Sequence, residues 1–326
     1  MTRVGALMLA AIAVIALAAP WLAPHAPDRR FPELLYAPPT RVHLARADAG
    51  GYRLQIYPWR LVSRIERRFE PAVERPVALR WFSGRSLVTA APDAGAPLLL
   101  LGADALGRDI FSRLVHGSRV TLLLALLATA GATLVGALIG AAAGFAGGRV
   151  DALLSRVSEL ILVLPTLYVA LALRAVMPLV LPPATVFAGL MAVFTLLGWP
   201  IVARGVRAIV AAERQRDYAS AAHALGASRS RILLRHLLPA AIPHVAVQAT
   251  LLLPAFILAE ATLSYVGLGF PDSSPTWGTM LQQAGNVALL AEAPWVLSPA
   301  AAIFAVVLAT NLLIQGTGRA PVQLER

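Results

Sequence analysis

Six apolar runs divide this chain, and each is about as long as the ~20-residue helix that crosses a lipid bilayer. The chain of 326 residues is 58% hydrophobic with a mean hydropathy of +0.70, which excludes an ordinary soluble globular protein. We therefore predict an all-α polytopic membrane protein with six transmembrane helices. The predicted spans are Val4–Pro24, Val120–Phe145, Glu159–Met177, Ala184–Ala203, Ile242–Gly267 and Trp295–Gln315.

Small residues and a proline add detail to three of these runs. The first run also has the small residues of a signal peptide near its end, but it is long for a signal core, so we interpret it as a span. In the second run Gly136, Gly140 and Gly144 recur every four residues, a spacing that favours close helix packing in lipid. Pro165 in the third run predicts a kink.

The distribution of charge predicts the orientation. All 28 basic residues are arginines, the formal net charge is +11, and the arginines lie outside the apolar runs except for Arg174, near the end of the third run. This distribution suits a membrane protein better than a nucleic-acid-binding protein. Residues 204–236 hold seven arginines against Glu213 and Asp217, so the positive-inside rule places this segment, and both termini, in the cytoplasm. The absence of cysteine excludes disulfides and thiol chemistry.

Residues 25–98 differ in kind from the apolar runs. They hold 12 arginines and short alternating stretches such as Tyr52–Tyr57 and Val77–Phe82. This pattern predicts strands and turns in a small extracytoplasmic insert of β character, with a solvated linker as the alternative. We divide the chain into a first transmembrane helix (1–24), this insert (25–98), a core of five further spans (99–316) with a cytoplasmic loop (204–239), and a cytoplasmic tail (317–326).

The longest polar, basic interval of the second half runs from Asp217 to Pro239. Its pattern predicts two short helices broken at Gly226, with Ser228 capping the second helix and Pro239 ending it. A short helix cannot bury an apolar face alone, so the interval predicts a groove on a partner protein. The apolar face of the first helix is made of Tyr218, Ala221, Ala222 and Leu225.

This interval resembles the cytoplasmic coupling loop of binding-protein-dependent ABC importer permeases. In that loop an acidic residue and two alanines precede a glycine, and Leu-Pro follows further on. Ser220 stands where the acidic residue is usual, and Asp217 and Glu213 are the carboxylates available to replace its contact. The resemblance implies that coupling to an ATPase involves Asp217, Tyr218, Ser220, Ala221, Ala222, Gly226, Leu238 and Pro239.

A second motif precedes the second span, where the chain from Leu101 reads Leu-Gly-Ala-Asp-Ala-Leu-Gly-Arg-Asp. We call Leu101–Arg119 the Gly-Arg-Asp segment. It resembles the segment that marks the dipeptide, oligopeptide and nickel branch of these permeases. Its alternating charges predict an amphipathic helix on the membrane surface, for which a purely structural role is the alternative. The motif residues are Asp104, Gly107, Arg108, Asp109 and Arg113.

Two further positions match the family. Glu260 lies within the fifth span, where a carboxylate is costly and usually faces a wet pathway or the bundle interior. A helix-packing hydrogen bond is the alternative. Trp277 belongs to a Pro-x-Trp-Gly pattern, which fits a re-entrant turn at the outer interface. We interpret both residues as candidates for the pathway or its gate.

The sequence predicts no catalytic chemistry in this chain. It contains no Gly-x-x-x-x-Gly-Lys-Ser/Thr motif, and its six scattered histidines predict no metal site. The resemblance implies that no cofactor binds here and that ATP and Mg bind two partner ATPase subunits. It also implies a second permease subunit, an extracytoplasmic solute-binding protein and a bacterial inner-membrane location. The implied function is import of di- or oligopeptides. Import of nickel or another small solute, and an ion-gradient-driven secondary transporter, are the alternatives.

Overall fold

A computed structural model describes residues 2–46, 52–64, 66–83, 86–90, 96–176, 178 and 181–317. The chain forms two compact units, which we describe one at a time. The first unit comprises Met1–Thr2, Leu122–Leu263 and Thr310–Arg326, and the second comprises Arg3–Thr121 and Ser264–Ala309. The predicted tail, 317–326, lies outside the described residues except for Thr317.

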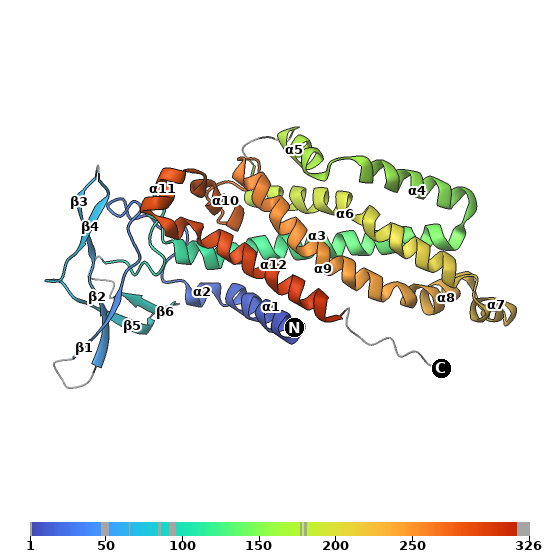
Figure 1. Cartoon of the computed structure of the whole chain (residues 1–326), viewed down its shortest axis with the longest axis horizontal. Helices are drawn as coiled ribbons and strands as arrows, with labels where there is room; N and C mark the ends of the chain where they lie inside the picture. Colours follow the sequence, from blue (N-terminus) through green and yellow to red (C-terminus); the bar gives the residue numbers. More distant parts are fainter. Residues whose placement is uncertain are drawn as a thin grey trace. The chain divides into compact units, whose positions relative to one another are not determined.

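The first unit is built from helices (Figure 1). Its main members are most of α3 (Ile110–Ala146), α4 (Gly148–Val163), α5 (Thr166–Val176), α6 (Pro183–Glu213), α7 (Asp217–Ala224), α8 (Arg229–Ile232) and most of α9 (Ile242–Tyr265). The end of α12 (Ser298–Thr317) also belongs to it.

Four helical stretches of the described chain are long and apolar enough to span a membrane. They contain the second and fourth predicted spans and all but the last one or two residues of the fifth and sixth. The first predicted span forms α1 (Thr2–Leu17) and the short α2 (Ala19–Leu22). With 16 residues α1 extends only ~24 Å, less than the ~30 Å bilayer core. The four stretches are Ile110–Ala146, Pro183–Glu213, Arg229–Tyr265 and Pro294–Ile314.

The third predicted span is wrong as a single helix. Helices α4 and α5 are separated at Pro165 and are bent by 81° relative to each other. Leu164, which precedes the proline, has ψ of 129° and so leaves the helical conformation. Proline disfavours the α conformation in the residue before it and lacks an amide donor, so the predicted kink becomes a break.

The predicted glycine stripe brings α3 and α6 into direct backbone contact. A Cβ built on Gly136 would lie 2.6 Å from the Trp199 carbonyl oxygen, and one on Gly140 would lie 2.4 Å from that of Ala203. No real Cβ atom approaches another atom so closely. The two helices therefore pack more tightly than any side chain would permit, as the spacing predicts.

Residues 25–98 belong to the second unit, and their described part contains six strands. Four strands form an antiparallel sheet in the order β1-β2-β5-β6, and β3 and β4 form a separate antiparallel pair. Ile56, Val77 and Ala90 pack with Leu98 in a small apolar core on one face. The strands are β1 (Val42–Arg46), β2 (Tyr52–Ile56), β3 (Trp59–Ser63), β4 (Arg68–Pro71), β5 (Val77–Ser83) and β6 (Ser86–Ala90).

Short helices complete the second unit, together with α1, α2 and most of α12. They are α10 (Trp277–Leu281), α11 (Val287–Glu292) and the 3-10 turns Gln282–Gly285 and Pro294–Leu297. Helix α2 packs on β6, and the Ser86 hydroxyl donates a hydrogen bond of 2.9 Å to the Ala23 carbonyl. The sheet is thereby attached to the end of the first apolar segment.

Gly140→Ala should destabilise the protein because the added methyl group meets the α6 backbone. We expect the free energy of unfolding to fall by roughly 1–3 kcal/mol, the usual cost of overpacking. Ala142→Val is the matched control, since Ala142 is exposed on the same helix and its larger replacement does not contact the α6 backbone. Thermal unfolding of both purified variants measures the effect. Equal melting temperatures would contradict the close contact.

Candidate coupling site and buried charge cluster

Helices α7 and α8 form a compact helix–turn–helix, residues 217–232, which we call the α7–α8 knob (Figure 1). Gly226 ends α7 with φ of +82°, a conformation that glycine adopts without strain. Its amide donates to the His223 carbonyl at 3.0 Å, and the Ala227 amide donates to the Ala222 carbonyl at 3.0 Å. These are the two hydrogen bonds of a Schellman stop. The predicted break at Gly226 is confirmed.

Ser228 caps α8 as predicted, because its hydroxyl accepts a hydrogen bond from the Arg231 amide. The predicted helix end at Pro239 is wrong. The helical path continues as a π-helical turn, Leu233–Leu237, and a 3-10 turn, Leu238–Ala241, and then joins α9. Proline lacks an amide donor, so here it changes the hydrogen-bond pattern without ending the helix. The Leu-Pro pair of the coupling motif therefore lies in the connection to α9.

One side of α7 is buried and the other is exposed. Ala219 is 5% exposed and packs into the core of the first unit, and Ala222 lies partly buried against the same core. Tyr218 is 41% exposed, Leu225 is 89% exposed, and Ala221 is also exposed. Most of the predicted apolar face is therefore uncovered by the described part of this chain, as expected of a surface that docks on a partner.

The polar residues of the α7–α8 knob are mostly exposed. The Tyr218 hydroxyl donates to Glu213 at 2.7 Å, and this hydrogen bond raises the pKa of Tyr218. Asp217 begins α7, where a negative charge suits the helix dipole, and Ser220 is exposed beside it. Of the two carboxylates that could replace the usual acid, Glu213 is thus engaged with Tyr218, and Asp217 is exposed.

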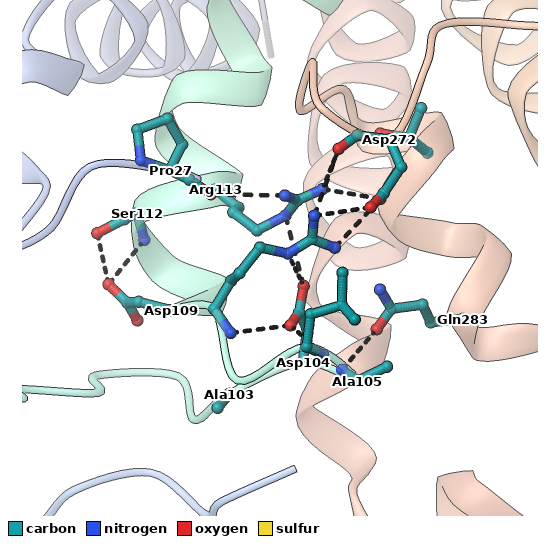
Figure 2. A network of polar contacts seen from close by, with 12 residues as sticks. Pro27, Ala103, Asp104, Ala105, Asp109, Ser112, Arg113, Asp272 and Gln283 are labelled. Carbon is teal, nitrogen blue, oxygen red and sulfur yellow. Dashed lines mark hydrogen bonds and ion pairs between the residues drawn. The ribbon is translucent and has the colours of Figure 1, made fainter. Parts of the chain in front are cut away.

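The second candidate site is a buried cluster of charges that includes the Gly-Arg-Asp segment (Figure 2). Arg108 donates to Asp104 at 2.6 Å and to both carboxylate oxygens of Asp272 at 2.7 and 3.1 Å. Arg113 lies 3.4 Å from Asp272 and 3.7 Å from Asp104. Arg113 is only 1% exposed. Two buried cations thus share two carboxylates, which offsets the loss of hydration.

Asp109 takes no part in these ion pairs and instead accepts hydrogen bonds at the start of α3. Its carboxylate accepts hydrogen bonds from the amides of Phe111 and Ser112 at 3.2 and 3.1 Å and from the Ser112 hydroxyl. It therefore caps the helix amino terminus. Burial raises the pKa of Asp109 to about 6, and the hydrogen bonds from Ser112 and Phe111 only partly oppose this shift.

The predicted amphipathic surface helix over the Gly-Arg-Asp segment is wrong. Residues before Ile110 form a loop, and α3 runs without interruption from Ile110 onward. Gly107 has φ of +70°, and a Cβ there would lie 2.1 Å from the Phe31 carbonyl oxygen, so only glycine fits. Asp104, Arg108 and Arg113 are buried because they pair with one another and with a distant loop, a contact that helical periodicity does not reveal.

Sequence reasoning missed Asp272, which completes the charge cluster. Burial opposes its ionisation, but hydrogen bonds and charge from Arg108 and Arg113 outweigh burial and lower the pKa of Asp272. One signal was available, since Asp272 is the only acidic residue between positions 261 and 291. Gln283 was also missed; it accepts a hydrogen bond from the Ala105 amide at 3.2 Å (Figure 2).

His25 is a further buried group that the sequence did not single out. Its amide donates to the Ser112 hydroxyl at 3.2 Å. Burial, followed by the nearby charge of Arg29, lowers the pKa of His25 to about 4, so the ring is neutral at physiological pH. His25 thus packs against the start of α3 as an uncharged residue.

The two candidate pathway residues lie in different units. Glu260, on α9 in the first unit, is 1% exposed. Trp277 begins α10 in the second unit and is 2% exposed. The Trp277 indole donates to the Leu114 carbonyl at 3.1 Å, and its amide donates to the Thr121 hydroxyl at 3.1 Å. A role for either residue in the pathway stays a prediction.

Comparison with known proteins identifies the class. Residues 136–319 match the family described as binding-protein-dependent transport system inner membrane component. Residues 1–39 match the N-terminal TM domain of oligopeptide transport permease C. The chain therefore belongs to the inner-membrane components of binding-protein-dependent transport systems. Within them, the match over 1–39 agrees with the predicted branch of dipeptide, oligopeptide and nickel permeases.

Two relatives in sequence agree with this assignment. The di/tripeptide transport system permease protein DppC of Pseudomonas aeruginosa is 32% identical over 313 residues, 96% of this chain and 84% of the relative. The oligopeptide transport system permease protein OppC of Bacillus subtilis is 35% identical over 60% of this chain and 61% of the relative. A solved structure of the MetNI methionine ABC transporter is 18% identical, with a TM-score of 0.47 over 64% of this chain and 97% of that one.

Asp272→Asn should destabilise the second unit, because it leaves two buried guanidinium groups with one carboxylate. We expect a loss of roughly 2 kcal/mol in the free energy of unfolding, since Asp272 itself is half-exposed. Asp28→Asn removes an exposed carboxylate of the same unit and should leave stability within about 0.5 kcal/mol. Thermal unfolding of both variants measures the difference. An unchanged melting temperature of the Asp272→Asn variant would show that the charge cluster contributes little to stability.

Proposed function

We propose that this chain is the membrane-spanning permease subunit of an ATP-driven importer that carries di- or oligopeptides. One observation carries the proposal: within the α7–α8 knob, α7 ends in a defined turn at Gly226, and the apolar side chains of Tyr218 and Leu225 are exposed. The family supplies the class of protein. The peptide substrate rests on the relatives, which are named for di/tripeptide and oligopeptide transport.

The uncovered face of α7 is the surface that a groove on an ATPase subunit would hold. Ala219 fastens the opposite side of α7 to the core of the first unit, so a displacement of the knob must displace that core. Closure of the ATPase dimer around ATP and Mg would then move the spans. This chain supplies no residue to the hydrolysis itself, and its contribution is mechanical.

The proposed topology has six spans and both termini in the cytoplasm. Helices α1 and α2 together make the first span, and the bent pair α4 and α5 makes the third. This assignment puts the α7–α8 knob inside and the strands of residues 25–98 outside. It agrees with the arginine-rich 204–236 segment, because short basic loops stay in the cytoplasm.

The proposed partners are a second permease subunit, two ATPase subunits and an extracytoplasmic solute-binding protein. Glu260 is the proposed pathway residue, since a carboxylate this buried in an apolar helix usually serves transport. Trp277 is the proposed gate. Docking of the solute-binding protein outside must bias the ATPase inside, because coupling between two sites is reciprocal.

Gly226→Ala should reduce the peptide imported per ATP hydrolysed by about fivefold, because a non-glycine residue at φ of +82° is strained by ~1–2 kcal/mol. Gly148→Ala is the matched control. Gly148 also has positive φ, +55°, and neither position has an atom within 4 Å of the added Cβ, yet Gly148 lies outside the knob. Uptake and ATPase assays in proteoliposomes measure the ratio. An equal fall in peptide imported per ATP hydrolysed in both variants would contradict coupling through the α7–α8 knob.

Cysteine labelling tests the topology, and the chain lacks native cysteine, so the background is empty. An impermeant maleimide should label Arg53→Cys in spheroplasts, which expose the outer surface of the inner membrane, because β2 is proposed to face outward. Arg231→Cys on α8, which is also exposed in the structure, should be labelled only after lysis. The opposite pattern would invert the topology and remove the knob from any cytoplasmic ATPase.

A further inference from the structure

A cavity of about 400 Å³ opens beside the α7–α8 knob, entirely within the first unit. Its walls come from the ends of α3 and α6 and from α7 and α8. Three basic side chains and one hydroxyl line it, together with small or apolar residues such as Ala219 and Ile232. The basic and hydroxyl groups are Arg214, His223, Arg229 and Ser220.

Among the described residues, no carboxylate pairs with the basic side chains of this cavity. None of the described residues that line it is acidic. Arg214, His223 and Arg229 form no salt bridge with any carboxylate of the described chain. The acidic residue closest in sequence to Arg214, Glu213, is engaged with Tyr218 at 2.7 Å and with Arg216 at 3.3 Å.

The basic side chains that line the cavity differ in the hydrogen bonds that they already form within the chain. Arg214 donates a hydrogen bond of 2.7 Å to the Phe145 carbonyl, so it also satisfies the exposed carbonyl end of α3. Arg229 has no hydrogen bond or salt bridge of its side chain within the described residues. Its five donors are therefore available to a ligand. Arg229 is the residue whose replacement reports on the ligand with the least effect on the fold.

We propose that this cavity binds a phosphate group, with Arg229 and Arg214 as its cationic ligands and Ser220 as a hydroxyl donor. A guanidinium group offers parallel N–H donors that match two phosphate oxygens. His223 adds a further donor. Ala219 and Ile232 supply an apolar wall for whatever the phosphate carries.

Volume favours a phospholipid headgroup as the source of that phosphate over a free ion. One water molecule takes ~30 Å³ of liquid, so a cavity of about 400 Å³ is much larger than inorganic phosphate needs. Basic pockets at the cytoplasmic ends of membrane helices are common sites for anionic lipid headgroups. This choice of source rests on the proposed topology, whereas the phosphate site itself does not.

Native mass spectrometry of the delipidated full chain tests the site. Retention of added phosphatidylglycerol should exceed that of neutral phosphatidylcholine. Arg229→Gln should lower the affinity for phosphatidylglycerol by about tenfold, the effect expected from one lost charge-assisted hydrogen-bonding group. Arg231→Gln is the matched control, since Arg231 is exposed on the same helix but does not line the cavity. Calorimetric titration with inorganic phosphate forms the second arm.

Each outcome decides the proposal. The site is supported if Arg229→Gln lowers the affinity for phosphatidylglycerol while Arg231→Gln retains the affinity of the unmodified chain. Binding of inorganic phosphate without preference for phosphatidylglycerol supports a phosphate site whose ligand is the free ion. Equal losses in both variants indicate general surface charge and overturn the site, as does binding of neither ligand. The measurement needs no ATPase or transport, so a failure here leaves the proposed function standing, and the reverse also holds.

Discussion

The contact on which the first unit depends is the backbone approach of α3 and α6. Gly136, Gly140 and Gly144 present no side chain over three successive turns, and the facing carbonyl oxygens lie where a Cβ would be. Lipid offers no hydrophobic drive for helix association, so such close van der Waals contact has to supply the stability. Two helices joined at this distance behave as one stiff body. Helix α6 ends at Glu213, only a few residues before α7 begins, so that body carries the α7–α8 knob.

The second unit is stabilised in a different way. The loop before α3 and the first turn of α3 meet the loop before α10 through Asp104, Arg108, Arg113 and Asp272. Buried charges contribute little net stability, but removal of one partner is costly, so such a cluster specifies which loops pair more than how strongly they pair. The same reasoning explains why Arg108 and Arg113 are buried, unlike the arginines of the α7–α8 knob, which are exposed.

The sequence predicts the local features well because local chemistry determines them. The stop at Gly226 and the cap at Ser228 depend on residues within one helical turn, and the glycine stripe depends on spacing alone. The burial of Arg113 could not be predicted, because its partner Asp272 is 159 residues away along the chain. A kink at Pro165 was predicted, but the separation into two helices was not, since periodicity does not tell whether a proline kinks a helix or breaks it. The continuation past Pro239 was missed because a proline is compatible with π and 3-10 turns.

The knob is attached to the bundle by two connections of unequal stiffness. On one side, α6 is packed along α3, and Arg214 bonds the end of α3 through the Phe145 carbonyl. On the other side, the path from α8 to α9 passes through a π-helical and a 3-10 turn, with Pro239 and Pro243 withholding amide donors. Irregular hydrogen bonding of this kind yields more readily than a regular helix. A force applied to α7 therefore acts directly on the α3–α6 pair, but it reaches α9 only through the more deformable π-helical and 3-10 turns. Under the proposed function, Glu260 on α9 would respond to the motion of the pair and not to the knob alone.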